Sequence, residues 1–259
     1  MQALPQEEKV LLPIAPVTVK QHEYVSEEEC EFKAPPGVTV ESESCDDYEL
    51  PNNQTAGHSR DKGYTDWLCK PEKHLLLKPF LGKKSYHEKQ FYSTNYATLS
   101  QGLKEFLPEF YGLKYIKFPN GKLYEYIAMK DFSTFFKKPS ILDIKMGRRT
   151  YDDDAEQWKI DYEISKFPQQ EQTGMRFAGM KLFNKITKTY TKFDAKQARN
   201  ITEDLIPQTL TQFFTTTENK LRIDFLLELQ KKLKELLEVF EKAEDGMKFV
   251  AASILSFSV

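Results

Sequence analysis

Residues 139–147 read Pro-Ser-Ile-Leu-Asp-Ile-Lys-Met-Gly, and this stretch decides the fold. The short apolar run predicts a strand, in which successive side chains point to opposite faces of a sheet. Asp143 and Lys145 are therefore expected on one face, and Leu142 and Ile144 on the other. Because burying charge costs solvation free energy, the strand indicates a cleft that uses both charges or, as the alternative, a structural ion pair.

The composition suits a globular protein. The chain has 259 residues, of which 40% are hydrophobic, so it can bury one sizeable core or two small lobes. No apolar run is long enough to cross a membrane, and no basic segment precedes an apolar one at the start, so we expect neither a span nor a signal peptide. Three scattered cysteines favour a reducing compartment, the cytoplasm or the nucleus.

Charge is distributed unevenly along the chain. The first fifty residues contain 12 acidic and 3 basic residues, whereas the remainder contains 34 basic and 27 acidic ones. Residues 1–54 also contain six prolines and show no helix or strand periodicity, so we expect a largely disordered segment before a folded domain at 55–259. The basic domain indicates a polyanionic ligand. Nucleic acid is disfavoured, because basic residues are not interleaved with aromatic ones.

The pattern Pro-x-x-x-Asp-x-Lys-x-Gly at 139–147 resembles the signature of the inositol polyphosphate kinases. Thr-Tyr-Asp-Asp-Asp-Ala at 150–155 and Ser-Lys-Phe-Pro at 165–168 are most similar to the multikinase branch of that family. The resemblance runs from about residue 56 to 259 and is patchy in the first lobe. It implies a two-lobed α+β fold with antiparallel sheets and flanking helices, distantly similar to protein kinases, with an N-lobe at 55–132 and a C-lobe at 133–259.

The resemblance also implies a reaction, in which ATP and magnesium serve to phosphorylate a soluble inositol polyphosphate, foremost a trisphosphate or tetrakisphosphate. A monomer without membrane contact is expected. The alternative is a non-catalytic module that binds inositol phosphate or nucleotide, because the family's C-terminal Ile-Asp-Phe segment, whose aspartate binds the metal, is missing. The metal ligands are therefore left unassigned, with Asp131 or one of Asp152 to Asp154 as possible substitutes.

In the expected N-lobe, Lys78 lies among leucines in a strand at 73–80, where a lysine needs a partner or a phosphate. Glu88 falls in a helix expected at 86–107 and is the natural partner of Lys78, since a strand lysine oriented by a helix glutamate holds nucleotide phosphates in protein kinases. The alternative for Glu88 is an ordinary exposed position. Lys130 and Phe132 belong to the connector between lobes, which by position would offer backbone groups to adenine.

In the expected C-lobe, Lys159 and Lys166 lie seven residues apart on a helix that begins at Ala155, capped by Asp154, and they share one face. Ile160, Ile164 and Phe167 are expected to form its buried stripe. The resemblance implies that Asp143 and Lys145 are catalytic, that Asp143 also binds nucleotide, and that the substrate phosphates are held by a set of basic residues: Lys84, Lys145, Lys159, Lys166 and Arg199. The alternative for the helix lysines is a solvated charged face.

The last elements are scaffold. Residues 177–193 predict a hairpin, and 219–243 predict a long amphipathic helix whose leucine stripe faces the core. The apolar, uncharged stretch at 248–259 predicts a strand at an open edge of the sheet.

Overall fold

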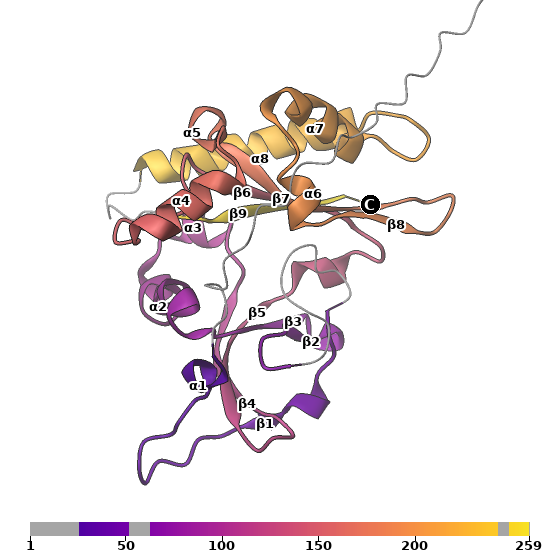
Figure 1. Ribbon diagram of the computed structural model, residues 1–259. Coiled ribbons are helices and arrows are strands. Elements are labelled where there is room, and N and C mark those ends of the chain that lie inside the picture. The colour runs from indigo at the N-terminus through magenta and orange to yellow at the C-terminus, as the bar shows by residue number, and fades with distance from the viewer. Residues whose placement is uncertain (1–25, 52–62, 243–248, 259) are drawn as a thin grey trace, which may run out of the picture.

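The computed structural model describes residues 26–51, 63–242 and 249–258. They form two lobes, each built on its own sheet. Figure 1 shows the N-lobe below the C-lobe. The lower N-lobe sheet has the order β1-β4-β5-β3-β2, and the upper C-lobe sheet has the order β8-β7-β6-β9.

The N-lobe sheet is organised around its central strand β5. Alternate residues of that strand enter two different cores: Tyr124, Tyr126 and Ala128 pack on one face, and Ile127 and Met129 on the other. A hairpin joins β4 and β5, with a turn in which Gly121 takes φ +81°. The strands are β1 (Glu43–Ser44), β2 (Leu68–Lys70), β3 (Leu75–Pro79), β4 (Phe110–Lys117) and β5 (Leu123–Lys130).

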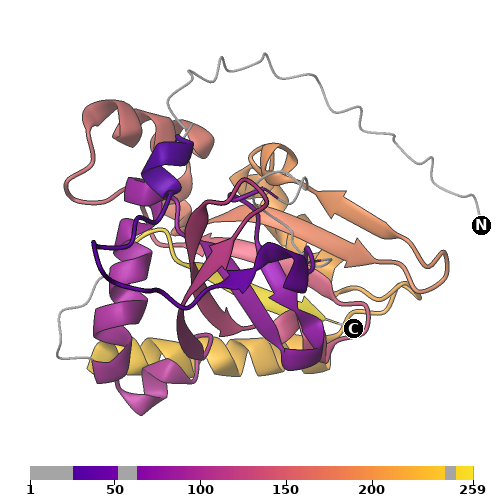
Figure 2. The same cartoon turned by 90° about the horizontal axis from the view of Figure 1, so that it is seen from below.

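The expected disorder of residues 1–54 is wrong for the part that the structure describes. Residues 26–51 contain helix α1 (Glu27–Cys30) and strand β1, and they run across the N-lobe sheet (indigo in Figure 2). Cys30 and Cys45 are almost fully buried in the N-lobe core. Composition misled because the acidic residues pair with distant lysines: Glu43, for example, accepts from Lys114 and Lys70.

The single helix expected over 86–107 is instead broken into short pieces. These are α2 (Tyr86–Gln90), a π-helical turn (Phe91–Asn95), a 3₁₀ turn (Tyr96–Thr98) and α3 (Gln101–Lys104). Ser93 and Thr98 donate hydrogen bonds to backbone carbonyls, and Ser100 caps α3. Such side chains compete with helix hydrogen bonds, so the run of Ser, Thr and Asn divides the helix.

The C-lobe sheet packs its inner face against helices. Leu142, Phe177 and Met180 of the sheet meet Phe213 and Phe214 of α7 in one core cluster. The expected strands and hairpin are present: β6 (Ser140–Met146), β7 (Met175–Phe183), β8 (Tyr190–Phe193) and β9 (Ser253–Ser258). The helices are α4 (Gln157–Lys166), α5 (Gln170–Thr173), α6 (Ala195–Ala198), α7 (Ile206–Phe214) and α8 (Ile223–Lys242). Among the described residues, no helix is both long and apolar enough to cross a bilayer.

Helix α8 was expected to bury its whole leucine stripe, and only its first half does so. Leu226 and Leu229 pack on the C-lobe core, whereas Leu237 is 57% exposed. The helix (yellow, upper part of Figure 1) extends beyond the sheet, and its second half packs against α3. The packing is close: a Cβ atom added to Gly102 of α3 would lie 3.3 Å from the side chain of Val239. The leucine stripe of α8 is therefore longer than the part of the C-lobe core against which it can pack.

Candidate active site

The expected pair of Lys78 and Glu88 is present. Nζ of Lys78, on β3, lies 2.6 Å from both carboxylate oxygens of Glu88, on α2. Both side chains remain about one third exposed, at 29% and 35%, so the ammonium group is held in place and is still reachable. The geometry matches what neutralising nucleotide phosphates requires.

Two backbone N–H groups of the connector between the lobes already donate hydrogen bonds within the protein. The N–H of Lys130 donates to the carbonyl of Glu109, and that of Asp131 donates to the carbonyl of His74. Asp131 is itself a capping residue, since its carboxylate accepts from the N–H and the hydroxyl of Ser133. One carboxylate oxygen of Asp131, Oδ1, is therefore already engaged within the connector.

Lys145 lies where the charges of both lobes meet. Its Nζ donates to the carbonyl of Ala251 at 2.6 Å. Burial lowers the pKa of this lysine from its ordinary value; Asp143 opposes that shift, while Lys78 of the N-lobe and Arg176 of the C-lobe reinforce it. The strand that the sequence singled out therefore brings its lysine within electrostatic reach of the Lys78 pair.

Asp143 carries a buried carboxylate oxygen, Oδ1, that has no hydrogen-bond partner among the described residues. The facing strand β7 is irregular at this point, because the register shifts between Asp143 and Ile144. A buried carboxylate oxygen without a donor is costly, and such groups are found where a ligand supplies the donor or a cation. Asp143 and Lys145 are not a closed structural ion pair.

Lys159 and Lys166 share one face of α4, as predicted, but they converge on Glu163. Nζ of Lys166 lies 2.7 Å and Nζ of Lys159 3.2 Å from the same oxygen, Oε1. The hydroxyl of Thr150 donates to Oε2 at 2.8 Å, and Arg176 lies 3.7 Å from it. Burial would raise the pKa of Glu163, but the hydrogen bonds and charges of its partners lower it overall, so the carboxylate is ionised at neutral pH.

The buried stripe expected on α4 forms only in part. Phe167, directly after the helix, is buried and Ile160 is partly buried, but Ile164 is 47% exposed and Glu163 is buried instead. The helix also begins later than expected, with Glu156 rather than Asp154 at its N-cap. The apolar periodicity failed at Ile164 because an ion-paired network occupies part of the inward face of this helix.

Arg176 belongs to the same charged cluster, although its sequence pattern did not single it out. It lies on β7 directly opposite Lys145, and it contacts Glu163. Burial lowers the pKa of its guanidinium, and Glu163 and Asp143 oppose that shift. Lys78 was recognised because it is a basic residue in an apolar strand. Arg176 of β7 has the same pattern and could have been recognised in the same way.

Two further residues expected to bind substrate phosphates are Arg199 and Lys84. Arg199 ends helix α6, its Nε is buried without a hydrogen-bond partner among the described residues, and its charge acts on Arg176. Lys84 lies in a 3₁₀ turn, and its side chain falls outside the described residues. A hollow of about 180 Å³ lies between the loop after β6 and helix α4, and its lining includes Arg148, Thr150 and Glu163.

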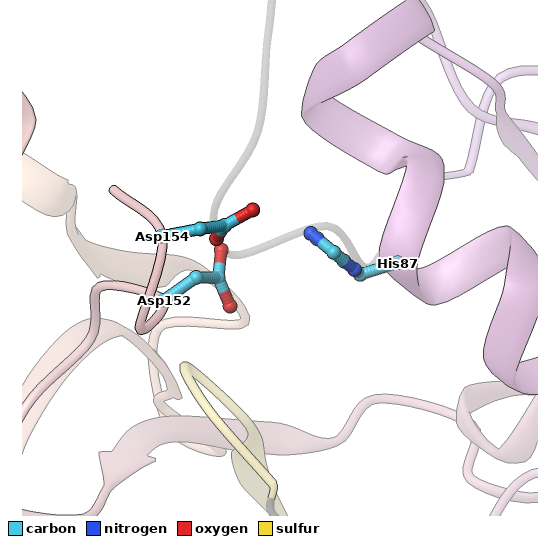
Figure 3. A group of neighbouring side chains, drawn as sticks. All are labelled: His87, Asp152 and Asp154. Atoms are coloured by element: carbon cyan, nitrogen blue, oxygen red, sulfur yellow. The ribbon is translucent and has the colours of Figure 1, made fainter. Parts of the chain in front are cut away.

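His87 of α2 faces Asp152 and Asp154 of the loop after β6 across the boundary between the lobes (Figure 3). Each offers one ligand atom, and these atoms lie within 4.8 Å of one another. All three side chains are exposed. An imidazole with two carboxylates suits a transition metal better than magnesium, which prefers oxygen ligands throughout.

Comparison with known proteins gives a consistent result. Residues 126–258 match the inositol polyphosphate kinase family. Inositol polyphosphate multikinase of Homo sapiens is 27% identical over 209 residues, which cover 79% of this chain and 49% of the relative. Inositol hexakisphosphate kinase 2 of Mus musculus is 30% identical over 134 residues, covering 51% of this chain and 30% of the relative. The chain spans about half the length of the multikinases that it matches.

Two solved structures share the fold. An inositol phosphate multikinase from S. cerevisiae, in complex with ADP and Mn²⁺, superposes with a TM-score of 0.53 at 21% identity, covering 71% of this chain and 74% of that one. A second inositol phosphate multikinase structure gives a TM-score of 0.52 at 20% identity, covering 66% and 77%. The α+β kinase-like fold expected from the sequence is confirmed.

Proposed function

The chain belongs to the inositol polyphosphate kinase family, and from that membership we propose that it transfers the γ-phosphoryl group of ATP to a hydroxyl of an inositol polyphosphate. The observation that carries the proposal is the position of Lys145, which lies on β6 opposite Arg176 of β7, and whose ammonium group is within electrostatic reach of Lys78 and Glu88 of the N-lobe. Phosphoryl transfer needs positive charge between nucleotide and acceptor, and Lys145 supplies it there.

The nucleotide would occupy the N-lobe side. Lys78, held by Glu88, neutralises its phosphates. The N–H groups of Lys130 and Asp131 are taken, so adenine contacts from the connector fall to Phe132 and the residues beside it. The unpartnered Oδ1 of Asp143 would accept a hydrogen bond from a ribose hydroxyl or coordinate magnesium, both of which arrive with ATP. When bound, magnesium neutralises the charge that develops on the transferred phosphoryl group.

The inositol phosphate would occupy the C-lobe side. The Nε atoms of Arg176 and Arg199 are buried without a hydrogen-bond partner among the described residues, and Lys159 and Lys166 of α4 share Glu163 with Arg176. Each phosphate of a polyphosphate needs charge-assisted donors, and these residues provide them. We propose an inositol trisphosphate or tetrakisphosphate as substrate, with Lys84 as a further contact.

The test is turnover by the full chain. Purified protein is incubated with ATP, magnesium and an inositol trisphosphate or tetrakisphosphate, and inositol phosphates and ADP are quantified by chromatography. We expect one ADP for each phosphate added. The matched control is Asp143→Asn, which keeps the shape of the side chain and removes its charge. If the protein binds both ligands and forms no more ADP than this variant, the non-catalytic module is the correct function.

A further inference from the structure

An imidazole of one lobe and two carboxylates of the other converge on one point, away from the charged network of helix α4. His87 lies on α2 of the N-lobe, and Asp152 and Asp154 lie in the loop after β6 of the C-lobe (Figure 3). The three side chains turn their ligand atoms toward one another across the boundary between the lobes. Within residues 26–51, 63–242 and 249–258, this is the one group of three or more histidine, cysteine or acidic side chains that comes so close together.

The two aspartates are held near each other without a compensating basic side chain. They lie on one turn, in which the N–H of Ala155 donates to the carbonyl of Asp152 at 3.2 Å. Arg149 pairs with Asp153, the residue between them, and among the described residues neither Asp152 nor Asp154 has an ion pair. Neighbouring carboxylates repel each other, and a bound cation removes that repulsion. A cation at this point would therefore supply a charge that the turn lacks.

The kind of ligands and their spacing suit a transition metal ion. Zn²⁺ binds imidazole nitrogen and carboxylate oxygen at about 2.0–2.2 Å, so two ligand atoms on one ion lie roughly 3–3.5 Å apart. The ligand atoms of the three residues lie within 4.8 Å of one another, and rotation of these exposed side chains can bring them to that spacing. Three protein ligands leave one position of a tetrahedral ion for water.

A metal ion held by these residues would join the two lobes. His87 directly precedes Glu88, whose carboxylate lies 2.6 Å from Nζ of Lys78. The turn with the two aspartates follows β6, the strand that carries Lys145. The ion would therefore hold α2 against the loop after β6, and with α2 the residue that orients Lys78.

We propose that His87, Asp152 and Asp154 bind one divalent transition metal ion, foremost Zn²⁺, and that this ion links the N-lobe to the C-lobe. The site is distinct from the magnesium that would arrive with ATP at Asp143, because it uses other residues, includes a nitrogen ligand and requires no nucleotide. The metal site does not depend on the proposed kinase activity.

The experiment titrates ZnCl₂ into the full chain by calorimetry, in the absence of nucleotide and after treatment with a chelator that is then removed. His87→Ala and Asp154→Asn should each weaken Zn²⁺ binding at least about tenfold, because each removes a direct ligand. His74→Ala is the matched control: His74 is an exposed histidine of the same lobe and belongs to no such group among the described residues. It should leave the affinity unchanged, and excess MgCl₂ should not displace the Zn²⁺.

Thermal unfolding measures how far the ion stabilises the folded chain. At a Zn²⁺ concentration about 100 times the dissociation constant, the unfolding temperature of the wild-type chain should rise by roughly 5–10 °C. That of His87→Ala should rise by no more than about half as much at the same concentration. Unfolding without metal checks that each variant folds, and His87→Gln replaces the alanine variant if that variant does not.

Loss of affinity in both the His87 and the Asp154 variants supports a site shared by the lobes, whether or not the chain phosphorylates an inositol phosphate. Three results would overturn the inference. The first is that the wild-type chain binds no Zn²⁺. The second is equal affinity for the wild-type chain and His87→Ala, which would place the ion elsewhere. The third is a loss with Asp154→Asn alone, which would leave the ion on the carboxylates of one lobe.

Discussion

The two sides of the site arrange their lysines differently. On the N-lobe side, one lysine faces one carboxylate, Lys78 with Glu88, and both remain about one third exposed. On the C-lobe side, Lys159, Lys166 and Arg176 share the single carboxylate of Glu163, which is almost fully buried. Under the proposed function, the first arrangement orients one charge for the phosphates of ATP, and the second holds the charges that would meet the inositol phosphate.

The largest expected effect comes from the residue between the two sides. Lys145→Ala should lower the rate of phosphoryl transfer by about 10²–10³-fold, because it removes a preorganised positive group from the reacting centre. Single-turnover kinetics with ATP and an inositol trisphosphate would measure it. Lys137→Ala removes an exposed lysine just before the same strand and should change the rate little. Equal rates for both variants would show that the two sides do not meet at Lys145.

A smaller effect should separate the nucleotide side from the substrate side. Glu88→Gln releases Lys78, and we expect ATP to bind about tenfold more weakly while inositol phosphate affinity is preserved. Titration of each ligand alone gives the two numbers. Stability should fall by less than about 1 kcal/mol, since the pair is partly exposed. Glu72→Gln, at an exposed position, is the control; a matching loss of inositol phosphate binding would contradict the division.

The smallest effect concerns stability on the C-lobe side. Lys166→Ala removes a partner of Glu163 that is 11% exposed, and we expect it to lower the free energy of unfolding by about 1–3 kcal/mol. Lys159→Ala removes one that is 33% exposed and should cost about 0.5 kcal/mol or less. Urea unfolding curves of both variants give the comparison. The reverse order would mean that Lys159 is the main partner of Glu163.

The central strand at 139–147 could be predicted from its local pattern, and the pairing of Lys78 with Glu88 from the lysine–glutamate arrangement of protein kinases. A lysine among leucines requires a partner, and alternation places Asp143 with Lys145. The helix at 86–107 and the exposure of Ile164 on α4 could not be predicted correctly. In the first case side-chain hydrogen bonds overrode periodicity; in the second, a charged network took the inward face.

The sequence by itself determined the family, the order of the main strands and the charges that a polyphosphate site requires, since these are properties of neighbouring residues. Apart from the pair of Lys78 and Glu88, only the tertiary structure decided which charges compensate one another. Glu43 pairs with Lys70 and Lys114, and Glu163 with Arg176, across stretches of chain that no local pattern connects. An ion pair depends on distance in space and on exclusion of water, and the fold alone sets both.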